Sequence, residues 1–462
     1  LHKLDKEASH PDRSLYANNQ AVYGLLRYGV QVKTEAGKPM ATVRLINWEQ
    51  PEKNHFAVAQ EVTLKKGDAL ERRPDVVLYV NGIAMGVLEL KNSRVSIGDG
   101  VRQNLSNQQP QFNQWFFSTV QLILAGNDSE GLQYGTTGTE AKYFLTWKED
   151  EADNSGYKLD KYLRKLCSKQ RLLELVHDFV LFDGGVKKLP RVHQYFGLKA
   201  AQEHVRQRKG GIIWHTQGAG KSILMVLLAK WILENLPQAR VVIITDRDEL
   251  DKQIERVFTQ AGEAIIRTSS GRDLMAQLAQ AKPRLLCSLV HKFGITPSQA
   301  DADFEAFIAD LQSQPSRTVG EVFVFVDECH RTQSGKLHRV MKAVMPNAVF
   351  IGFTGTPFRG DGIWLWQGKD PLFAGTATRV TMDELLKLGF LSPLVVDQGT
   401  PETIDTTGVK TSMGDYVVKD LENAALDPVI IKKTVSDLCE RGAERKKWLI
   451  FCVTIDHAKA VL

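Results

Sequence analysis

Six short apolar runs in the second half of the chain constrain its fold more than any other sequence feature. Each run is followed by a polar turn and by helical spacing of apolar residues; the runs are residues 212–214, 241–245, 285–290, 322–326, 349–353 and 449–453. Apolar runs without polar alternation, interleaved with helices, are typical of strands buried on both faces of a parallel sheet. The sequence therefore predicts an α/β fold with functional loops at the carboxyl ends of the strands.

The first 210 residues have a different pattern. Residues 54–64 and 74–91 are predicted strands, and Asn81-Gly82 lies between two apolar runs, which is a strong β-hairpin signal. Residues 159–182 show helical spacing and end at Asp183-Gly184-Gly185, which predicts a helical connector closing at a flexible joint. Residues 134–147 have the aromatic and Gly-Thr content of a closing strand, to which we assign packing and no chemistry.

Length and cysteine usage indicate a multidomain protein of the cytoplasm. A chain of 462 residues exceeds what one hydrophobic core usually supports, so two to four domains are expected. The five cysteines are scattered without CxxC spacing, which favours reduced thiols over disulfides or zinc. Neither a membrane-length apolar run nor a secretion signal is present. Because the chain begins with Leu and ends inside a helix-like pattern, we expect a fragment of a longer protein.

The charge is unevenly distributed. The net charge is +5, but residues 156–210 carry thirteen Lys or Arg against five Asp or Glu, a net of +8 that leaves −3 on the rest. This basic segment is an electrostatic footprint for a polyanion or, equally well on charge alone, a solvated helical face.

A glycine-rich segment after the first apolar run predicts a nucleotide site. Thr216-Gln217-Gly218-Ala219-Gly220-Lys221-Ser222 follows the predicted strand and opens a helix over residues 223–233. Glycines there let backbone N–H groups surround phosphates at a helix N-terminus. Lys221 would hold the β- and γ-phosphates of ATP, and Ser222 the Mg²⁺. His215 stands where the P-loop pattern has its first Gly.

A carboxylate pair supports the same site. The run 322–326 ends in Asp327-Glu328-Cys329-His330, at the sheet edge where the P-loop is expected. Asp327 can bind Mg²⁺, and Glu328 can orient and deprotonate the attacking water.

A second metal site is predicted near the N-terminus. Pro74-Asp75 precedes Glu89-Leu90-Lys91, and a hairpin through Asn81-Gly82 would bring Asp75 near Glu89. Glu89 and Lys91 share a face because the strand period is two. Two carboxylates form a site for Mg²⁺, with Lys91 positioning the nucleophile and neutralising the oxyanion. Taken alone, an exposed cross-strand ion pair explains the pattern as well, but Glu89 lies inside an apolar stretch, where a carboxylate needs a compensating cation.

With the P-loop and Asp327-Glu328, the chain resembles superfamily 2 helicases and translocases. Gln194 resembles the adenine-contacting Gln of that family, and Thr245-Asp246-Arg247-Asp248-Glu249-Leu250 a motif near the DNA track. Gly352-Phe353-Thr354-Gly355-Thr356-Pro357 resembles the motif coupling hydrolysis to movement, and residues 448–454 the first strand of a second motor domain. The later motifs, including an arginine finger, have no counterpart, so the fragment is expected to bind ATP and hydrolyse it poorly.

The Asp75, Glu89 and Lys91 pattern resembles PD-(D/E)xK nucleases. Placed ahead of this motor, with Trp214-His215-Thr216-Gln217-Gly218 at the P-loop, it resembles the restriction subunit of type I restriction-modification enzymes over nearly the whole chain. Gln103 resembles the Gln of that family's QxxxY motif, but Asn107 stands where the Tyr is expected.

This resemblance implies four regions and a function. The regions are a PD-(D/E)xK endonuclease domain (1–155), a basic helical connector (156–185), a RecA-like motor domain (186–380) and the start of a second (381–462). The implied function is ATP-dependent translocation of double-stranded DNA and Mg²⁺-dependent cleavage of unmodified foreign DNA away from the recognition site. Methyltransferase and specificity subunits are the implied partners. The expected ATP-site residues are Gln194, Thr216, Gly218, Gly220, Lys221, Ser222, Asp327 and Glu328.

Two other functions are compatible with the residues. A superfamily 2 helicase whose N-terminal domain binds without cleaving would keep nucleic-acid-stimulated ATPase activity but show no nicking. A nucleotide-gated scaffold would show ATP turnover that DNA leaves unchanged.

Overall fold

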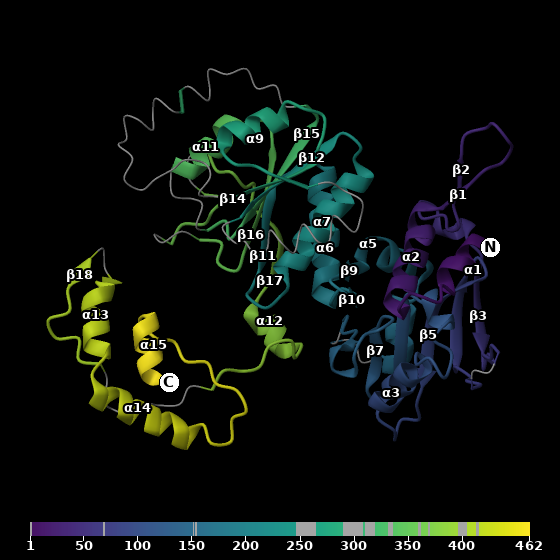
Figure 1. Cartoon of the computed structure of the whole chain (residues 1–462), viewed down its shortest axis with the longest axis horizontal. Helices are drawn as coiled ribbons and strands as arrows, with labels where there is room; N and C mark the ends of the chain where they lie inside the picture. Colours follow the sequence, from purple (N-terminus) through teal and green to yellow (C-terminus); the bar gives the residue numbers. More distant parts are fainter. Residues whose placement is uncertain are drawn as a thin grey trace. The chain divides into compact units, whose positions relative to one another are not determined.

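The computed structural model (Figure 1) describes residues 2–67, 70–150, 152, 155–245, 265–289, 308–309, 319–330, 336–358, 362–367, 370–395, 404–412 and 415–462. The chain divides into two compact units, Leu1–Leu391 and Ser392–Leu462.

A mixed six-stranded sheet forms the centre of the N-terminal region. Its strand order is β3-β4-β5-β6-β7-β8, and the neighbours are antiparallel except for the parallel pair β5 and β6. The strands are β3 (Phe56–Gln60), β4 (Val76–Val80), β5 (Ile83–Leu90), β6 (Leu122–Asn127), β7 (Gly131–Gly135) and β8 (Leu145–Thr146). The expected hairpin is confirmed, because Asn81 and Gly82 have φ of 51° and 79° and join β4 to β5.

Helices surround this sheet and connect its parallel strands. Helix α3 (Ile97–Asn107) is the crossover between β5 and β6, as parallel strands require. Helices α1 (His2–Ala8) and α2 (Leu15–Tyr28) precede the sheet, followed by the small hairpin of β1 (Val30–Val32) and β2 (Ala41–Val43). The 3-10 turns are η1 (Pro51–Lys53), η2 (Phe116–Ser118) and η3 (Ala141–Tyr143).

The connector is helical over only part of the length that the spacing predicts. It consists of α4 (Lys158–Leu166) and α5 (Lys169–Phe179), which restarts after Ser168, and then the antiparallel pair β9 (Leu181–Asp183) and β10 (Val186–Lys188). The joint at Gly184-Gly185 is therefore a hairpin turn, with φ of 56° and 89°, and not the end of a helix. Leu181 and Phe182 fit the helical spacing of the sequence, but they belong to β9 because β9 pairs with β10 across the turn.

A seven-stranded parallel sheet occupies the second part of the first unit. Its strand order is β13-β14-β12-β15-β16-β11-β17, and every pairing is parallel. The strands are β11 (Gly211–His215), β12 (Ala239–Thr245), β13 (Ile265–Arg267), β14 (Leu285–Leu289), β15 (Glu321–Asp327), β16 (Val349–Thr354) and β17 (Thr376–Val380). Five of the six apolar runs are thus confirmed as strands, and the predicted α/β fold class is confirmed with them.

Both faces of this sheet are covered, as uninterrupted apolar strands require. Alternate residues of β12, such as Val241 and Val242, belong to separate apolar clusters on opposite faces. One face packs against α6 (Val192–Arg206) and α7 (Lys221–Asn235), and the other against α9 (Gly271–Leu278) and α11 (Lys336–Val344) (Figure 1). Helix α12 (Met382–Lys387) ends the first unit beside the P-loop, where Leu385 packs on Ala219.

The sixth strand prediction, which falls in the second unit, is wrong. Residues 449–453 are not a strand, and Leu449 and Phe451 are 80% and 88% exposed. A strand needs neighbours for its backbone hydrogen bonds, and the described part of this unit offers only the pair of β18 (Thr411–Ser412) and β19 (Asp415–Tyr416). The helices here are α13 (Val418–Ala425), α14 (Pro428–Arg441) and α15 (Ile455–Val461).

Two further sequence features have structural counterparts. Among the described residues, no helix has the length and apolarity needed to cross a bilayer. The five cysteines form no disulfide, as expected; Cys287 and Cys329 are buried, Cys167 and Cys452 are partly exposed, and Cys439 is exposed.

Candidate nucleotide and nuclease sites

The glycine-rich segment has the backbone of a phosphate-binding loop. Gly218 and Gly220 adopt φ of 85° and 80°, and Gly220 is the left-handed N-cap of α7. That conformation favours glycine because a side chain would clash with its own backbone. Lys221 is the first helical residue, so Lys221 and Ser222 lie at the N-terminus of α7, where the helix dipole favours an anion.

His215 explains how the loop forms without its first glycine. The residue ends β11 in extended conformation, so no positive φ is needed there. Its ring is fully buried, with Nε2 3.5 Å from Thr378 Oγ1, while its carbonyl accepts a 3.1 Å hydrogen bond from Lys221 Nζ. Burial, together with the nearby His193 and Lys221, lowers the pKa of His215 to about 3, so the ring is neutral.

Helix α6 places Gln194 against the loop. Its Nε2 donates to the carbonyls of Ala219 (3.1 Å) and Gly220 (3.4 Å), and its Oε1 accepts from the Arg191 backbone. His193, which sequence reasoning passed over, also contacts the Ala219 carbonyl, at 3.0 Å from Nε2. Gln194 and His193 therefore hold the loop through its backbone carbonyls. Thr216 is held by a backbone hydrogen bond to Val380, at 3.0 Å.

Asp327 ends β15 and Glu328 follows it, and β16 lies between β15 and β11 in the sheet. All three strands run in the same direction, so the carboxylate pair and the P-loop share one sheet edge. Asp327 is 7% exposed, and its Oδ2 accepts a 3.3 Å hydrogen bond from Thr245 Oγ1. His330 Nδ1 lies 3.5 Å from Glu328 Oε2 and 2.8 Å from Thr354 Oγ1.

The motif after β16 reaches the P-loop. A Cβ on Gly355 would lie 3.4 Å from the Gln217 backbone nitrogen, and the Trp214 indole donates to the Gly355 carbonyl at 3.1 Å. Of the expected motif at residues 245–250, only Thr245 lies within the described residues.

The three predicted nuclease residues lie together at one end of the β4–β5 hairpin. Asp75 Oδ2 accepts a 2.7 Å hydrogen bond from the Leu90 backbone across the two strands. Lys91 Nζ lies 4.0 Å from Glu89 Oε2, so both side chains are on one face, as the strand period predicts.

Glu89 is the buried member of this cluster. Its side chain is fully buried, and its Oε2 has no hydrogen-bond partner among the described residues. Burial, then the charge of Asp75, raises the pKa of Glu89 to about 8, although Lys91 opposes the shift. Two carboxylates in this position repel each other when both are ionised.

Helix α3 supplies the amides around the cluster. Gln103 Oε1 accepts a 2.8 Å hydrogen bond from Lys91 Nζ, and Asn107 Nδ2 donates to Glu89 Oε1 at 3.3 Å. Asn107, at the position where the family has Tyr, thus contacts the buried carboxylate. The sequence shows that Asn107 stands in the place of the Tyr. It does not show the contact with Glu89, because that contact depends on which face α3 turns toward the sheet.

The residues present fit a magnesium ion at the nuclease cluster. Among the described residues no group of three or more His, Cys, Asp or Glu gathers as a metal site. Mg²⁺ does not need one, since it binds through one or two carboxylates, water and phosphate oxygens. The carboxylates of Glu89 and Asp75 offer two such groups, and Oε2 of Glu89 accepts no hydrogen bond within the normal distance.

Comparisons with known proteins agree with this division of the chain. Residues 1–142 match the family "Type I restriction enzyme R protein N terminus", and residues 193–367 match the SWI2/SNF2 ATPase family. The endonuclease subunit of the type I restriction enzyme HindI from Haemophilus influenzae is 29% identical over 74% of this chain and 35% of its own length. A putative type I endonuclease subunit, MjaIXP, from Methanocaldococcus jannaschii is 28% identical over 77% of this chain and 36% of its own.

The fold and the nucleotide site define a P-loop ATPase domain of the SWI2/SNF2 type, preceded by a separate α/β domain. The chain carries a domain of the type I restriction R-protein N-terminal family followed by an ATPase domain of the SWI2/SNF2 family, and it is similar to endonuclease subunits of type I restriction enzymes. It spans about a third of the length of the curated relatives it matches.

Solved structures give only distant similarity. A nuclease-deletion mutant of the Type ISP restriction-modification enzyme LlaGI with a DNA substrate mimic matches with a TM-score of 0.31 and 14% identity, over 43% of this chain and 20% of that one. The Sulfolobus solfataricus SWI2/SNF2 ATPase core with double-stranded DNA matches with a TM-score of 0.28 and 10% identity, over 40% of this chain and 34% of that one.

Proposed function

We propose that this chain is the nuclease and motor part of a type I restriction subunit. In this proposal ATP hydrolysis drives translocation along double-stranded DNA, and the N-terminal domain cuts unmodified foreign DNA away from the recognition site, with Mg²⁺ as cofactor. Methyltransferase and specificity subunits anchor the complex. The observation that carries the nuclease assignment is the buried Oε2 of Glu89, which accepts no hydrogen bond within the normal distance and lies beside Asp75 and 4.0 Å from Lys91 Nζ.

In the nuclease reaction, Asp75 and Glu89 would hold the metal ion, and Lys91 would position the attacking water. Mg²⁺ bound there would polarise the scissile phosphate and lower the pKa of a water molecule. Gln103 fixes the Lys91 ammonium through its 2.8 Å hydrogen bond, so the positive charge stays near the developing oxyanion. Asn107 orients the Glu89 carboxylate through Oε1, so Oε2 would be available to hold the metal ion.

In the ATPase reaction, Lys221 and the loop amides hold the phosphates. Ser222 and Asp327 would hold the magnesium ion of MgATP, and Glu328 would orient the water and accept its proton. Gln194 contacts the adenine, in keeping with its place beside Gly220. Gly355 lies close to the P-loop backbone. Loss of the γ-phosphate from the P-loop would therefore change the position of residues 352–357.

The proposal is tested in the full-length subunit assembled with its partner subunits. Plasmid cleavage, ATP turnover and translocation are measured with and without ATP and Mg²⁺. Asp75→Ala and Lys91→Ala should each abolish cleavage and leave ATP turnover within about two-fold of the wild type. Lys221→Ala should abolish ATP binding and translocation, while the N-terminal domain stays folded.

The matched control is Asp99→Ala, because Asp99 is an exposed acid on the same domain, paired with Arg102 on the surface of α3. It should cut normally. If both Asp75→Ala and Lys91→Ala cut as well as this control, the metal assignment is wrong. DNA-stimulated ATP turnover without any nicking by the wild type would favour the non-cleaving helicase instead.

A further inference from the structure

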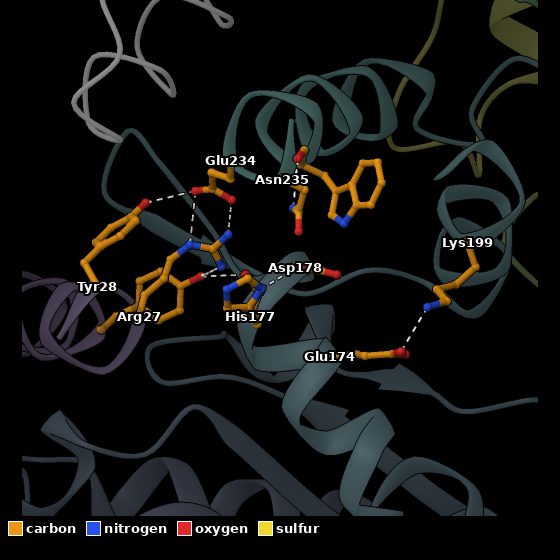
Figure 2. Close-up of polar contacts among 10 residues, drawn as sticks. Arg27, Tyr28, Glu174, His177, Asp178, Lys199, Glu234 and Asn235 are labelled. Atoms are coloured by element: carbon orange, nitrogen blue, oxygen red, sulfur yellow. Dashed lines mark hydrogen bonds and ion pairs between the residues drawn. The ribbon is translucent and has the colours of Figure 1, made fainter. Parts of the chain in front are cut away.

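A buried ion pair joins the N-terminal region to the helix that begins at the P-loop. Figure 2 shows Arg27 of α2 facing Glu234 of α7. Arg27 Nε donates to Glu234 Oε1 at 3.2 Å, and Nη2 donates to Oε2, so the pair is bidentate. Tyr28 adds a third donor to Glu234, with its hydroxyl 3.0 Å from Oε1. We call Tyr23, Arg27, Tyr28 and Glu234 the junction network.

Tyr23 and Arg27 of the junction network are buried, Glu234 is partly buried and Tyr28 is half exposed. The Arg27 side chain is 2% exposed and that of Glu234 22%. Arg27 Nη1 donates to Tyr23 Oη at 3.1 Å, and the Tyr23 hydroxyl donates in turn to the His177 carbonyl of α5 at 3.2 Å. Removing one partner of such a pair leaves an uncompensated buried charge, so the network holds α2 and α7 in one arrangement.

Helix α7 connects the junction network to the nucleotide site. Lys221 is its first residue and Glu234 lies in its last turn, about 20 Å away along the axis at 1.5 Å per residue. Residues 224–233 are all buried, so the helix has no solvent face along which to bend. A displacement at Lys221 is therefore carried to Glu234 by the helix as a whole.

Without Arg27, the negative charge of Glu234 would be destabilised at its position in α7. An acid in the last turn of a helix faces the negative end of the helix dipole. Burial works against the Glu234 carboxylate, but Arg27 and Lys230 outweigh it, and the pKa of Glu234 is lowered. The acid is thus ionised because of its partner in the N-terminal region.

A second contact joins the other helix of the nucleotide site. Glu174 of α5 accepts hydrogen bonds from Tyr195 Oη (2.6 Å) and Lys199 Nζ (2.9 Å), both on α6, which also carries Gln194. A cavity of about 660 Å³ lies beside these contacts, lined among others by Trp48 and Trp231. Beside this cavity, the polar contacts join α5 to α6 and α2 to α7.

We propose that α7 couples nucleotide binding to the N-terminal domain, and that the Arg27–Glu234 ion pair transmits the movement of α7 to α2. The proposal rests on the nucleotide site of the proposed function. Nucleotide at Lys221 and the intact junction network stabilise the same position of α7. Because coupling between two sites is reciprocal, breaking the pair weakens nucleotide binding.

The first test measures the Kd of a fluorescent, non-hydrolysable ATP analogue for the 462-residue chain. We expect Arg27→Gln and Glu234→Gln each to raise Kd by about five-fold or more, and the double variant to raise it no further than either single change. The matched control is Arg208→Gln, which breaks the Arg208–Glu321 ion pair within the motor region and should keep Kd within about two-fold. If Arg27→Gln does not fold, Tyr28→Phe removes one donor to Glu234 and should raise Kd by about two-fold.

The second test is hydrogen exchange with and without the analogue. In the wild type the analogue should slow exchange in α2 as well as around Lys221; in Glu234→Gln the effect at Lys221 should remain and the effect in α2 should vanish. Equal Kd values in all variants, or the same slowing of α2 in Glu234→Gln, would overturn the coupling alone. A wild-type chain that does not bind the analogue would overturn the proposed function itself.

Discussion

Asn107 takes the place of a tyrosine beside the buried carboxylate of the nuclease cluster, and its amide has a specific partner. Asn107→Leu removes the donor to Glu89 Oε1 and keeps a side chain of similar size. Residues that orient metal ligands typically contribute 10- to 100-fold to metal affinity or activity. We expect cleavage to fall by roughly that factor at limiting Mg²⁺, with partial recovery at high Mg²⁺ and unchanged ATP turnover.

The control for this change is Ser106→Ala, on the same helix and only partly buried. Cleavage by this variant should match the wild type at every Mg²⁺ concentration. A loss in Asn107→Leu that excess Mg²⁺ leaves untouched would mean that Asn107 supports the helix and does not orient Glu89.

Lys230 gives the stability of the chain a defined pH dependence. Burial lowers its pKa from 10.5 to about 7, assisted by Arg27 and opposed by Glu234 and Asp178; its Nζ lies over the Tyr23 ring. Between about pH 7 and 10 the unfolded chain holds this proton and the folded chain does not, so stability rises with pH across that window. Below pH 7 both states are protonated and the full cost of burial remains.

Lys230→Met should remove that cost. At pH 7 the variant should be more stable than the wild type by about 2 kcal/mol or more, and the difference should shrink as the pH approaches 10. Unfolding followed by circular dichroism from pH 6.5 to 10 measures this, with the exposed Lys209→Met as control. A difference that stays constant with pH would show that Lys230 is charged in the folded chain throughout.

Single residues also show the limit of inference from sequence. Asp75, Glu89 and Lys91 could be grouped because a hairpin of known register brings them together, although their catalytic roles remain predictions. The Arg27–Glu234 pair joins residues 207 positions apart, and no local pattern links them. Asn107 lies between these two cases. Its position in the motif could be found from the sequence, but its contact with Glu89 depends on which face α3 turns toward the sheet.

At the scale of elements, the N-terminus of α7 depends on a close approach by α6. Gly220 has φ of 80°, and a Cβ there would lie 2.1 Å from Gln194 Nε2. Gly220→Ala therefore strains the backbone by about 1–2 kcal/mol and also displaces Gln194. We expect the Kd for an ATP analogue to rise at least about ten-fold.

Gly156→Ala is the matched control, because Gly156 also has a positive φ, 71°, but open space around it. Its cost in stability should be similar and its effect on nucleotide binding negligible. Equal nucleotide affinity in the two variants would contradict the role given to the contact between Gly220 and Gln194.

The elements that sequence analysis found and missed differ in their physical basis. Five of the six apolar runs were predicted correctly as strands of the parallel sheet, because burial on both faces leaves no polar alternation. Strand β17 was missed because Thr376-Ala377-Thr378-Arg379-Val380 lies at the sheet edge, where only one neighbour is needed and polar residues are allowed. Residues 449–453 look like a buried strand, yet hydrophobicity alone does not form a strand without a partner to bond.

At the scale of the whole molecule, the division after Leu391 predicts an independent first unit. Helix α12 and Leu391 pack against Ala219 and Val380, so the nucleotide loop is completed within that unit. We expect residues 1–391 to fold and to bind an ATP analogue with a Kd within about three-fold of that of the 462-residue chain. Ending at Val380 instead would remove this packing and should weaken binding clearly.

Size-exclusion chromatography and analogue titration of the two fragments measure this prediction. Equal binding by both fragments would show that α12 does not support the loop. The expected boundary after residue 380 came from the spacing of motifs, which does not reveal that the next helix packs back onto the P-loop. The four-region division itself remains a prediction.

The uneven access to the thiols has a practical consequence. Burial, together with the neighbouring Glu328 and Asp327, raises the pKa of Cys329 well above that of a free thiol, and Cys287 is buried in β14. Cys439 on α14 is exposed. A maleimide dye should therefore label the second unit first and leave the ATP-binding edge chemically intact, which gives spectroscopists a site-selective reporter in a protein that keeps all its cysteines.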